Sequence, residues 1–139
     1  MKVLVLDDHK GFRDEVLRML THNGHEGHAV EKAVDAIPLV ESGEYDLVLI
    51  DFSMPEHDGI WFMQNVKKPR HTKALLVTAY VNNQVIDHMF RVGASGYIIK
   101  PFDEEDLLRQ LQHHCRGVTR NRAATVHSGE RSNAETQDQ

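Results

Sequence analysis

The chain has few cysteines, no long apolar run and no excess of positive charge. Its one cysteine, Cys115, excludes a disulfide framework and suits a reducing cytosol. No apolar stretch approaches the roughly 20 residues of a membrane-spanning helix, and the N-terminus carries no signal-peptide pattern. The net charge of -5 argues against a nucleic-acid surface, which needs concentrated Lys and Arg. We therefore expect a cytoplasmic protein that binds neither nucleic acid nor membrane directly.

Four short apolar runs each end in a polar side chain. They cover residues 3–6, 47–50, 75–77 and 97–99, and are followed by Asp7 and Asp8, by Asp51, by Thr78 and by Lys100. Such runs, separated by helix-length segments, are typical of parallel strands buried on both faces. The carboxyl ends of parallel strands share one edge, which is where open α/β sheets bind ligands. Three carboxylates, a hydroxyl and an ammonium in one crevice are suited to phosphoryl transfer.

Segments with helical periodicity alternate with these runs. The polar segment 26–30 predicts a further strand at an edge of the sheet. One helix is expected to start at Ala36 with Asp35 as N-cap, because Pro38 then falls in the first turn. Another is expected to turn Phe90 toward the core together with Val85, Ile86 and Met89. Five strands alternating with five helices predict a doubly wound α/β sheet.

A change of composition marks the end of the folded part. Residues 1–117 are expected to form one domain, because 139 residues support no more than that. Residues 118–139 are rich in Ser, Asn, Thr, Arg, Glu and Gln and show no periodicity. They are expected to be a disordered tail or a linker stub.

Four segments together resemble the receiver domains of bacterial two-component response regulators. They are the pair Asp7 and Asp8, the segment DFSMPEHDG at 51–59, Thr78 with Ala79, and the segment GASGYIIKPF at 93–102. The resemblance covers residues 2–116. It implies a flavodoxin-like, CheY-like fold, with a five-stranded parallel sheet in the order 2-1-3-4-5.

The resemblance also implies a phosphoacceptor and a cation. Asp51 would be phosphorylated by a sensor histidine kinase or a histidine phosphotransfer protein. Mg²⁺ would be bound directly by Asp8, Asp51 and the backbone carbonyl of Ser53, and by Asp7 through a water molecule. The chemistry of the residues agrees, since clustered carboxylates repel one another and a hard cation with oxygen ligands relieves this repulsion.

Further roles are implied for the other strand ends. Thr78 and Lys100 would bind the phosphoryl group, and Thr78 with Tyr97 would form a switch that reshapes the surface of the fourth helix, fifth strand and fifth helix. Ser53 and Tyr80 would tune dephosphorylation, because they flank the path of the attacking water. The Lys100–Pro101 bond would be cis. The output would be a downstream protein or a C-terminal domain absent from this sequence.

Three other functions fit the sequence less well. A hydrolase of the haloacid dehalogenase type also uses an Asp nucleophile with Mg²⁺, Thr and Lys, but it needs a second acid two residues later, where this chain has His9. A flavodoxin-like cofactor binder needs a phosphate loop after the first strand, where Asp7 and Asp8 would repel phosphate. A receiver fold used only for interaction is disfavoured by the full set of acids, Thr and Lys. We expect a phosphoacceptor and not an enzyme.

Ten histidines and one tryptophan remain outside this scheme. The histidines at 22–28 are interrupted by Gly24 and Gly27, so surface positions are favoured over a tetrahedral metal site. His9 and His57 lie near the expected site as modulators or bystanders. Trp61 is expected on the outward side of its helix, either as a contact surface or packed on a neighbouring loop.

Overall fold

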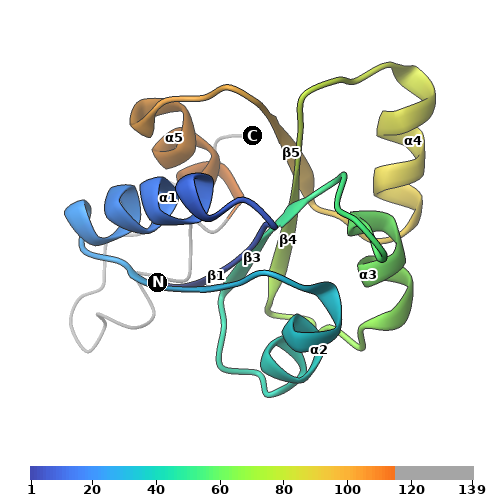
Figure 1. Ribbon diagram of the computed structural model, residues 1–139, viewed down its shortest axis with the longest axis horizontal. Helices are drawn as coiled ribbons and strands as arrows, with labels where there is room; N and C mark the ends of the chain where they lie inside the picture. The colour runs from blue at the N-terminus through green and yellow to red at the C-terminus, as the bar shows by residue number, and fades with distance from the viewer. Residues whose placement is uncertain (115–139) are drawn as a thin grey trace, which may run out of the picture.

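A five-stranded parallel sheet in the order β2-β1-β3-β4-β5 forms the centre of the computed structural model, which describes residues 1–114 (Figure 1). Its strands are β1 (Lys2–Leu6), β2 (Glu26–Val30), β3 (Leu47–Asp51), β4 (Lys73–Thr78) and β5 (Gly96–Ile99). The predicted doubly wound sheet, its strand order and the edge position of β2 are confirmed.

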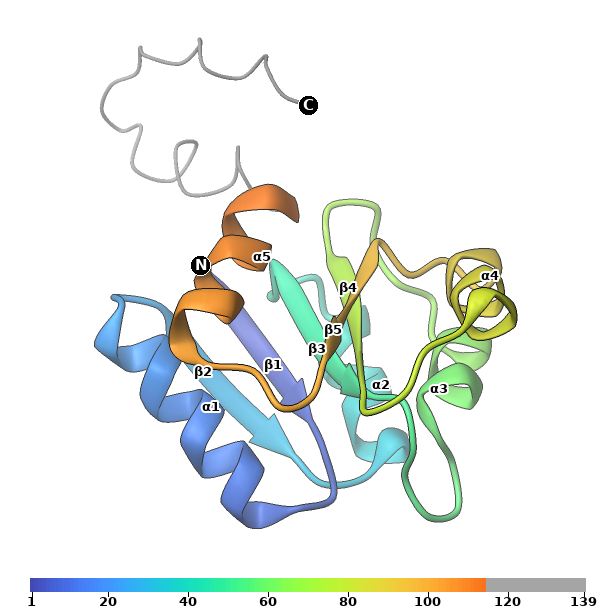
Figure 2. The same ribbon diagram turned by 90° about the horizontal axis from the view of Figure 1, so that it is seen from above.

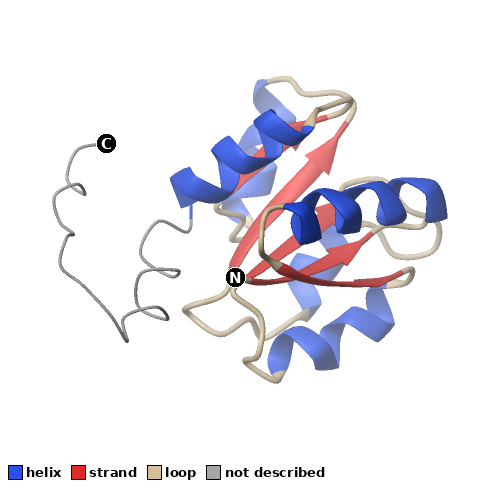
Figure 3. Cartoon of the chain, turned by 90° about the vertical axis from the view of Figure 1, so that its left-hand side faces the viewer, coloured by secondary structure: helices blue, strands red, loops and turns tan. Residues whose placement is uncertain are grey.

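Five helices cover the two faces of the sheet. They are α1 (Lys10–His22), α2 (Ala33–Glu41), α3 (Gly59–Asn65), α4 (Asn83–Arg91) and α5 (Glu104–His114). Helices α1 and α5 lie on one face and α2, α3 and α4 on the other (Figure 2). The view from the side shows the sheet enclosed between these layers (Figure 3). No helix among residues 1–114 is both long and apolar enough to cross a bilayer.

Alternation along the strands gives the protein two cores, one on each face of the sheet. Leu4, Ile50 and Leu76 pack toward α2, α3 and α4. Val5, Leu49 and Val77 pack toward α1 and α5. Strand β5 departs from the predicted burial on both faces, because Ile99 at its end is exposed. As an edge strand β5 pairs on one side only, with β4, so less of the molecule surrounds it.

The predicted start of α2 is wrong. The helix begins at Ala33 with Lys32 as N-cap, so Pro38 lies inside it and not in its first turn. The earlier start buries Ala33 on the same side as Ala36 and Val40. We attribute it to this burial, which offsets the one backbone hydrogen bond that Pro38 cannot donate.

The predicted burial of Phe90 is also wrong. Of the four apolar side chains on α4, Met89 is buried and Val85 packs against the core, whereas Phe90 is exposed. Positions 85 and 89 form one line along the helix and positions 86 and 90 a second, one residue further around. Only the first line meets the sheet. Asn82 caps the helix, accepting a hydrogen bond from the Val85 amide at 2.9 Å.

Cys115 and the expected domain boundary at residue 117 lie outside the described residues. Helix α5, which ends at His114, is the last element that the structure describes. Asp103 caps the start of this helix by accepting from the Asp106 amide at 2.8 Å.

Candidate functional site

The carboxyl edge of the sheet brings together the three predicted acids and the predicted lysine. Asp7 and Asp8 follow β1, Asp51 ends β3 and Lys100 follows β5. Carboxylate oxygens of the three acids lie within 4.8 Å of one another. The Lys100 ammonium lies 3.2 Å from Asp7 Oδ2 and 3.8 Å from Asp51 Oδ1. The peptide bond between Lys100 and Pro101 is cis, as the resemblance implied.

Two of these acids are buried almost completely. Asp7 is 1% exposed and Asp51 5% exposed. Both oxygens of Asp7 are engaged, because Oδ1 accepts from the His9 amide at 2.8 Å and Oδ2 accepts from Lys100 at 3.2 Å. Asp51 Oδ1 accepts from the Ser53 amide at 3.2 Å, which ties the loop after β3 to the carboxylate.

The charges at this edge do not balance. Burial, followed by the nearby Asp7 carboxylate, raises the pKa of Asp51 to about 6. Lys100 and the Ser53 amide act in the opposite direction but do not cancel the rise. One ammonium therefore cannot neutralise three carboxylates, and the ionised site favours the binding of a further cation.

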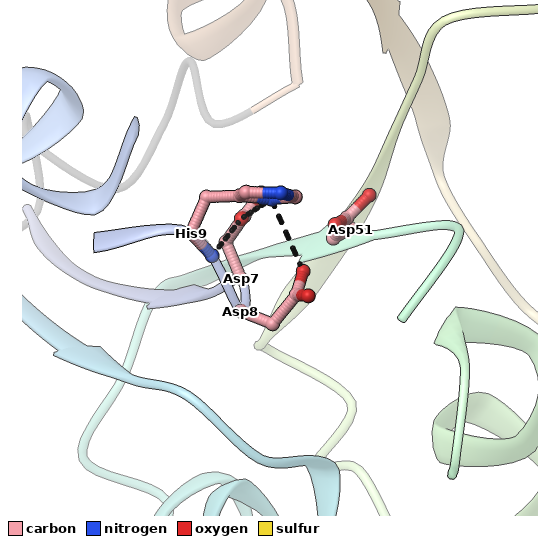
Figure 4. Close-up of side chains that lie close together, drawn as sticks. All are labelled: Asp7, Asp8, His9 and Asp51. Atoms are coloured by element: carbon pink, nitrogen blue, oxygen red, sulfur yellow. Dashed lines mark hydrogen bonds and ion pairs between the residues drawn. The ribbon is translucent and has the colours of Figure 1, made fainter. Parts of the chain in front are cut away.

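Asp8 offers a specific place for that cation. Its Oδ1 atom is buried and has no hydrogen-bond partner. The Nδ1 atom of His9 lies 3.3 Å from this oxygen (Figure 4). A buried carboxylate oxygen without a donor is costly unless something positive approaches it. The oxygen donors of Asp8 and Asp51 thus fit a hard divalent cation such as Mg²⁺.

The Thr78 hydroxyl is turned toward its own loop. It donates to the Tyr80 carbonyl at 2.9 Å and accepts from the Tyr80 amide at 3.2 Å. Thr78 is buried, whereas the Tyr80 ring is exposed. Tyr97 is aligned with Leu76, two residues before Thr78 on β4, and packs against the core beneath α2, α3 and α4. Thr78 and Tyr97 consequently belong to the same face of the sheet.

Residues of α1 that we had not assigned to the site help to hold it. The Lys100 ammonium lies 4.3 Å from the centre of the Phe12 ring, and Phe102 meets that ring edge-on at 5.7 Å. Arg13 donates to the Asp7 carbonyl at 2.9 Å. Nothing in the spacing of Arg13 from Asp7 indicated a contact.

Gly59 allows α3 to start against the end of β3. A Cβ atom at this position would lie 2.8 Å from the Asp51 carbonyl oxygen and 2.9 Å from a Leu76 methyl carbon. Asp58 caps the helix, accepting from the Trp61 amide at 2.9 Å. Asp58 and Gly59 together therefore start α3 and set it against the backbone of Asp51.

The remaining candidates lie apart from the acids or at the margin of the site. Trp61 is partly buried and stacks on His57, with ring centres 3.8 Å apart, so packing on a neighbouring loop is confirmed. His22 contacts Glu104 and His28 contacts Tyr45. Among residues 1–114, the only group of acids, cysteines and histidines close enough to share a metal is Asp7, Asp8, His9 and Asp51.

Comparisons with known proteins agree with this geometry. The family model described as "Response regulator receiver domain" matches residues 3–112. Chemotaxis protein CheY-3 of Vibrio cholerae is 30% identical over 115 residues, which are 80% of this chain and 88% of that protein. Transcriptional regulatory protein PdtaR of Mycobacterium tuberculosis is 30% identical over 131 residues, which are 93% of this chain and 62% of that protein.

The solved structure of CheY4 of Vibrio cholerae is 29% identical in sequence and has a TM-score of 0.76. The match covers 81% of this chain and 96% of that one. The chain is a member of the response regulator receiver domain family of two-component signalling.

Proposed function

We propose that Asp51 accepts a phosphoryl group from the phosphohistidine of a sensor histidine kinase or a histidine phosphotransfer protein. The observation that carries this proposal is the buried Asp51 carboxylate beside the Lys100 ammonium, at the edge where open α/β sheets bind ligands. A carboxylate oxygen attacks phosphorus as the bond to the histidine nitrogen breaks. Positioning and charge neutralisation govern such transfers, so a carboxylate is an adequate nucleophile.

Four residues would hold Mg²⁺ at this site. Asp8, Asp51 and the carbonyl of Ser53 would bind it directly, and the buried Asp8 Oδ1, which accepts no hydrogen bond, supports this assignment. Asp7 would act through a water molecule, because both its oxygens already accept hydrogen bonds. When bound, Mg²⁺ supplies positive charge to the oxygens of the transferring group.

Lys100 and Thr78 would bind the phosphoryl group itself. The Lys100 ammonium lies 3.8 Å from Asp51 Oδ1 and 4.3 Å from the centre of the Phe12 ring, so it lies close to the carboxylate that would be phosphorylated. The Thr78 hydroxyl would exchange its bonds to Tyr80 for a phosphoryl oxygen. That rotation vacates space on the face that Thr78 shares with Tyr97. The Tyr97 ring would turn into this space and reshape the surface formed by α4, β5 and α5.

The phosphorylated protein would act on a downstream protein target or an attached output domain. We place it in the cytoplasm, where its kinase partner would supply the phosphoryl group. It would take part as a phosphoacceptor and not as a multiple-turnover enzyme. Ser53 and Tyr80 would flank the water that ends the signal, and neither carries a carboxylate or amide that could orient it.

The test is phosphorylation of the purified chain by acetyl phosphate with Mg²⁺. We expect an acid-stable, alkali-labile adduct that mass spectrometry places on Asp51. Asp51→Asn should abolish it while leaving the fold intact, because the substitution removes the nucleophile and keeps the side-chain shape. Asp14→Asn, at an exposed position on α1, is the matched control and should be labelled like the wild type. Undiminished labelling of Asp51→Asn would contradict the assignment.

A further inference from the structure

His9 lies at the mouth of the acidic site. It follows Asp8 directly, is the N-cap residue of α1, and has an extended backbone with φ −100° and ψ 116°. Its amide is tied to Asp7 Oδ1 at 2.8 Å, which fixes where the side chain emerges. The imidazole is 72% exposed, so the ring has room to rotate.

The ring nitrogen Nδ1 points toward the carboxylates. It lies 3.3 Å from Asp8 Oδ1 and 3.5 Å from Asp7 Oδ1 (Figure 4). Two atoms that each bind one ion at about 2.1 Å are about 3.0 Å apart as neighbours and about 4.2 Å apart on opposite sides. One atom from each of Asp7, Asp8, His9 and Asp51 can be chosen so that all lie within 4.8 Å of one another. The imidazole nitrogen is thus close to a ligand position before any cation is bound.

We propose that His9 supplies a nitrogen ligand to the cation held by Asp8 and Asp51, which makes this site favour divalent transition metals over Mg²⁺. The inference rests on the metal site of the proposed function and adds one residue to it. Mg²⁺ prefers oxygen ligands and gives up its waters reluctantly, so an imidazole ligand adds little to the affinity of the site for Mg²⁺. Divalent first-row transition ions accept imidazole beside carboxylates readily. A mixed oxygen and nitrogen ligand set therefore shifts selectivity between the two classes of ion.

The geometry also accounts for the exposure of His9. A ligand at the mouth of the site can join a cation that already sits on the buried carboxylates, without being part of the core. The neighbouring His57 offers a contrast, because its ring is stacked on Trp61. His57 serves as the matched control for a histidine near the site that does not bind the ion.

The test uses Mn²⁺ bound to the full chain and pulsed electron paramagnetic resonance, which detects nitrogen bound to the ion. We expect nitrogen coupling in the wild type and in His57→Phe, and its loss in His9→Phe. Co²⁺ affinity should fall at least about tenfold in His9→Phe, as is usual when a group that supports a metal site is removed. Mg²⁺ affinity should stay essentially unchanged.

Wild-type Mn²⁺ without nitrogen coupling would overturn the inference, and so would coupling that persists in His9→Phe. Nitrogen coupling that survives in Asp8→Ala would also overturn it, since the ion would then be held by other histidines. Labelling by acetyl phosphate with Mg²⁺ separates this inference from the proposed function. If His9→Phe is labelled on Asp51 but its Co²⁺ affinity equals that of the wild type, the inference fails and the phosphoacceptor assignment stands.

Discussion

Two aspartates buried to a similar degree lie at opposite ends of β3 and have different surroundings. Asp46, just before the strand, is 3% exposed, and Asp51, at its end, is 5% exposed. The Asp46 carboxylate accepts from the Lys2 amide at 2.8 Å. The backbone of Asp46 bonds to Lys2 on one side and to Lys73 on the other, at 2.8 and 3.0 Å. Asp51 instead faces Asp7, and its pKa is raised to about 6.

The difference shows that burial alone does not make an aspartate functional. At the amino end of the sheet the Asp46 carboxylate meets a backbone donor of β1, and the Asp46 backbone bonds to both β1 and β4, so this residue contributes to the pairing of the strands. At the carboxyl end the chain gathers three acids with one lysine, and Asp8 Oδ1 has no donor. We therefore expect Asp46 to stabilise the fold, and the ionised Asp51 carboxylate to oppose folding until a ligand balances its charge.

The largest stability effect should come from Asp51→Asn without Mg²⁺. The folded-state pKa of Asp51 lies above the ordinary value of 3.8, so the folded protein holds this proton more tightly than the unfolded chain. This contribution to stability is complete below about pH 4 and is lost as the pH rises through about 6. The stability of Asp51→Asn relative to the wild type should therefore rise by up to about 3 kcal/mol between pH 4 and pH 7.

Urea unfolding of both proteins at several pH values measures this difference. Titrating groups away from this site contribute equally to both curves, so they cancel in the comparison with Asp51→Asn. A difference that stays constant from pH 4 to pH 7 would mean that the Asp51 charge is already balanced in the folded protein.

Asp46→Ala should have the opposite effect on stability. Removal of the Asp46 carboxylate leaves the Lys2 amide without its hydrogen-bond acceptor. A buried donor that is left unsatisfied costs about 1–3 kcal/mol of stability. Asp46→Asn keeps an acceptor oxygen and should lose less. Both variants should still be phosphorylated on Asp51. If urea unfolding finds Asp46→Ala as stable as the wild type, the proposed structural role of this carboxylate is wrong.

Mg²⁺ should raise the stability of the wild type, because a ligand that binds only the folded state stabilises it by mass action. At about ten times the Kd the gain is about 1.4 kcal/mol, which raises the Tm by several degrees. Asp8→Ala should lose most of this shift, and Asp14→Ala should keep it. Thermal unfolding with and without Mg²⁺ measures the shift, and an equal shift in Asp8→Ala would place the ion elsewhere.

Sequence reasoning located the acids and the lysine because strand ends are simple to identify. The apolar runs before Asp51, Thr78 and Lys100 marked buried parallel strands, and parallel strands must end at one edge. Strand order followed from the resemblance, carried by segments at those same ends. The fold and the assembly of the charged groups were predictable for this reason.

What the sequence missed depends on contacts between distant segments. The Phe12 ring near the Lys100 ammonium and the close approach of Gly59 to Leu76 join residues far apart in the chain. The start of α2 and the exposure of Phe90 depend on how much of each helix meets the sheet. Helical periodicity gives the direction of a side chain but not the extent of the surface that it meets.

The smallest effect we predict concerns Tyr80, at the rim of the same carboxyl edge. Its ring is exposed and near Asn82, whose side-chain amide donates to the Tyr80 hydroxyl at 3.3 Å. Its backbone is held by the Thr78 hydroxyl, so the ring stands beside the group that would bind phosphate. Hydrolysis needs a water in line with the phosphorus–oxygen bond, and a bulky ring excludes or misplaces that water.

Tyr80→Glu should therefore lose phosphate several-fold faster than the wild type, because a carboxylate can hold the water that the ring excludes. Tyr80→Phe keeps the ring and should hydrolyse at the wild-type rate, which separates the effect of bulk from that of the hydroxyl. A phosphate-release assay on the purified phosphorylated protein measures both rates. If Tyr80→Glu hydrolyses no faster than Tyr80→Phe, the ring does not control access of water. The lifetime of the phosphorylated state would then be set by the groups nearer to Asp51, with Ser53 as the next position to vary.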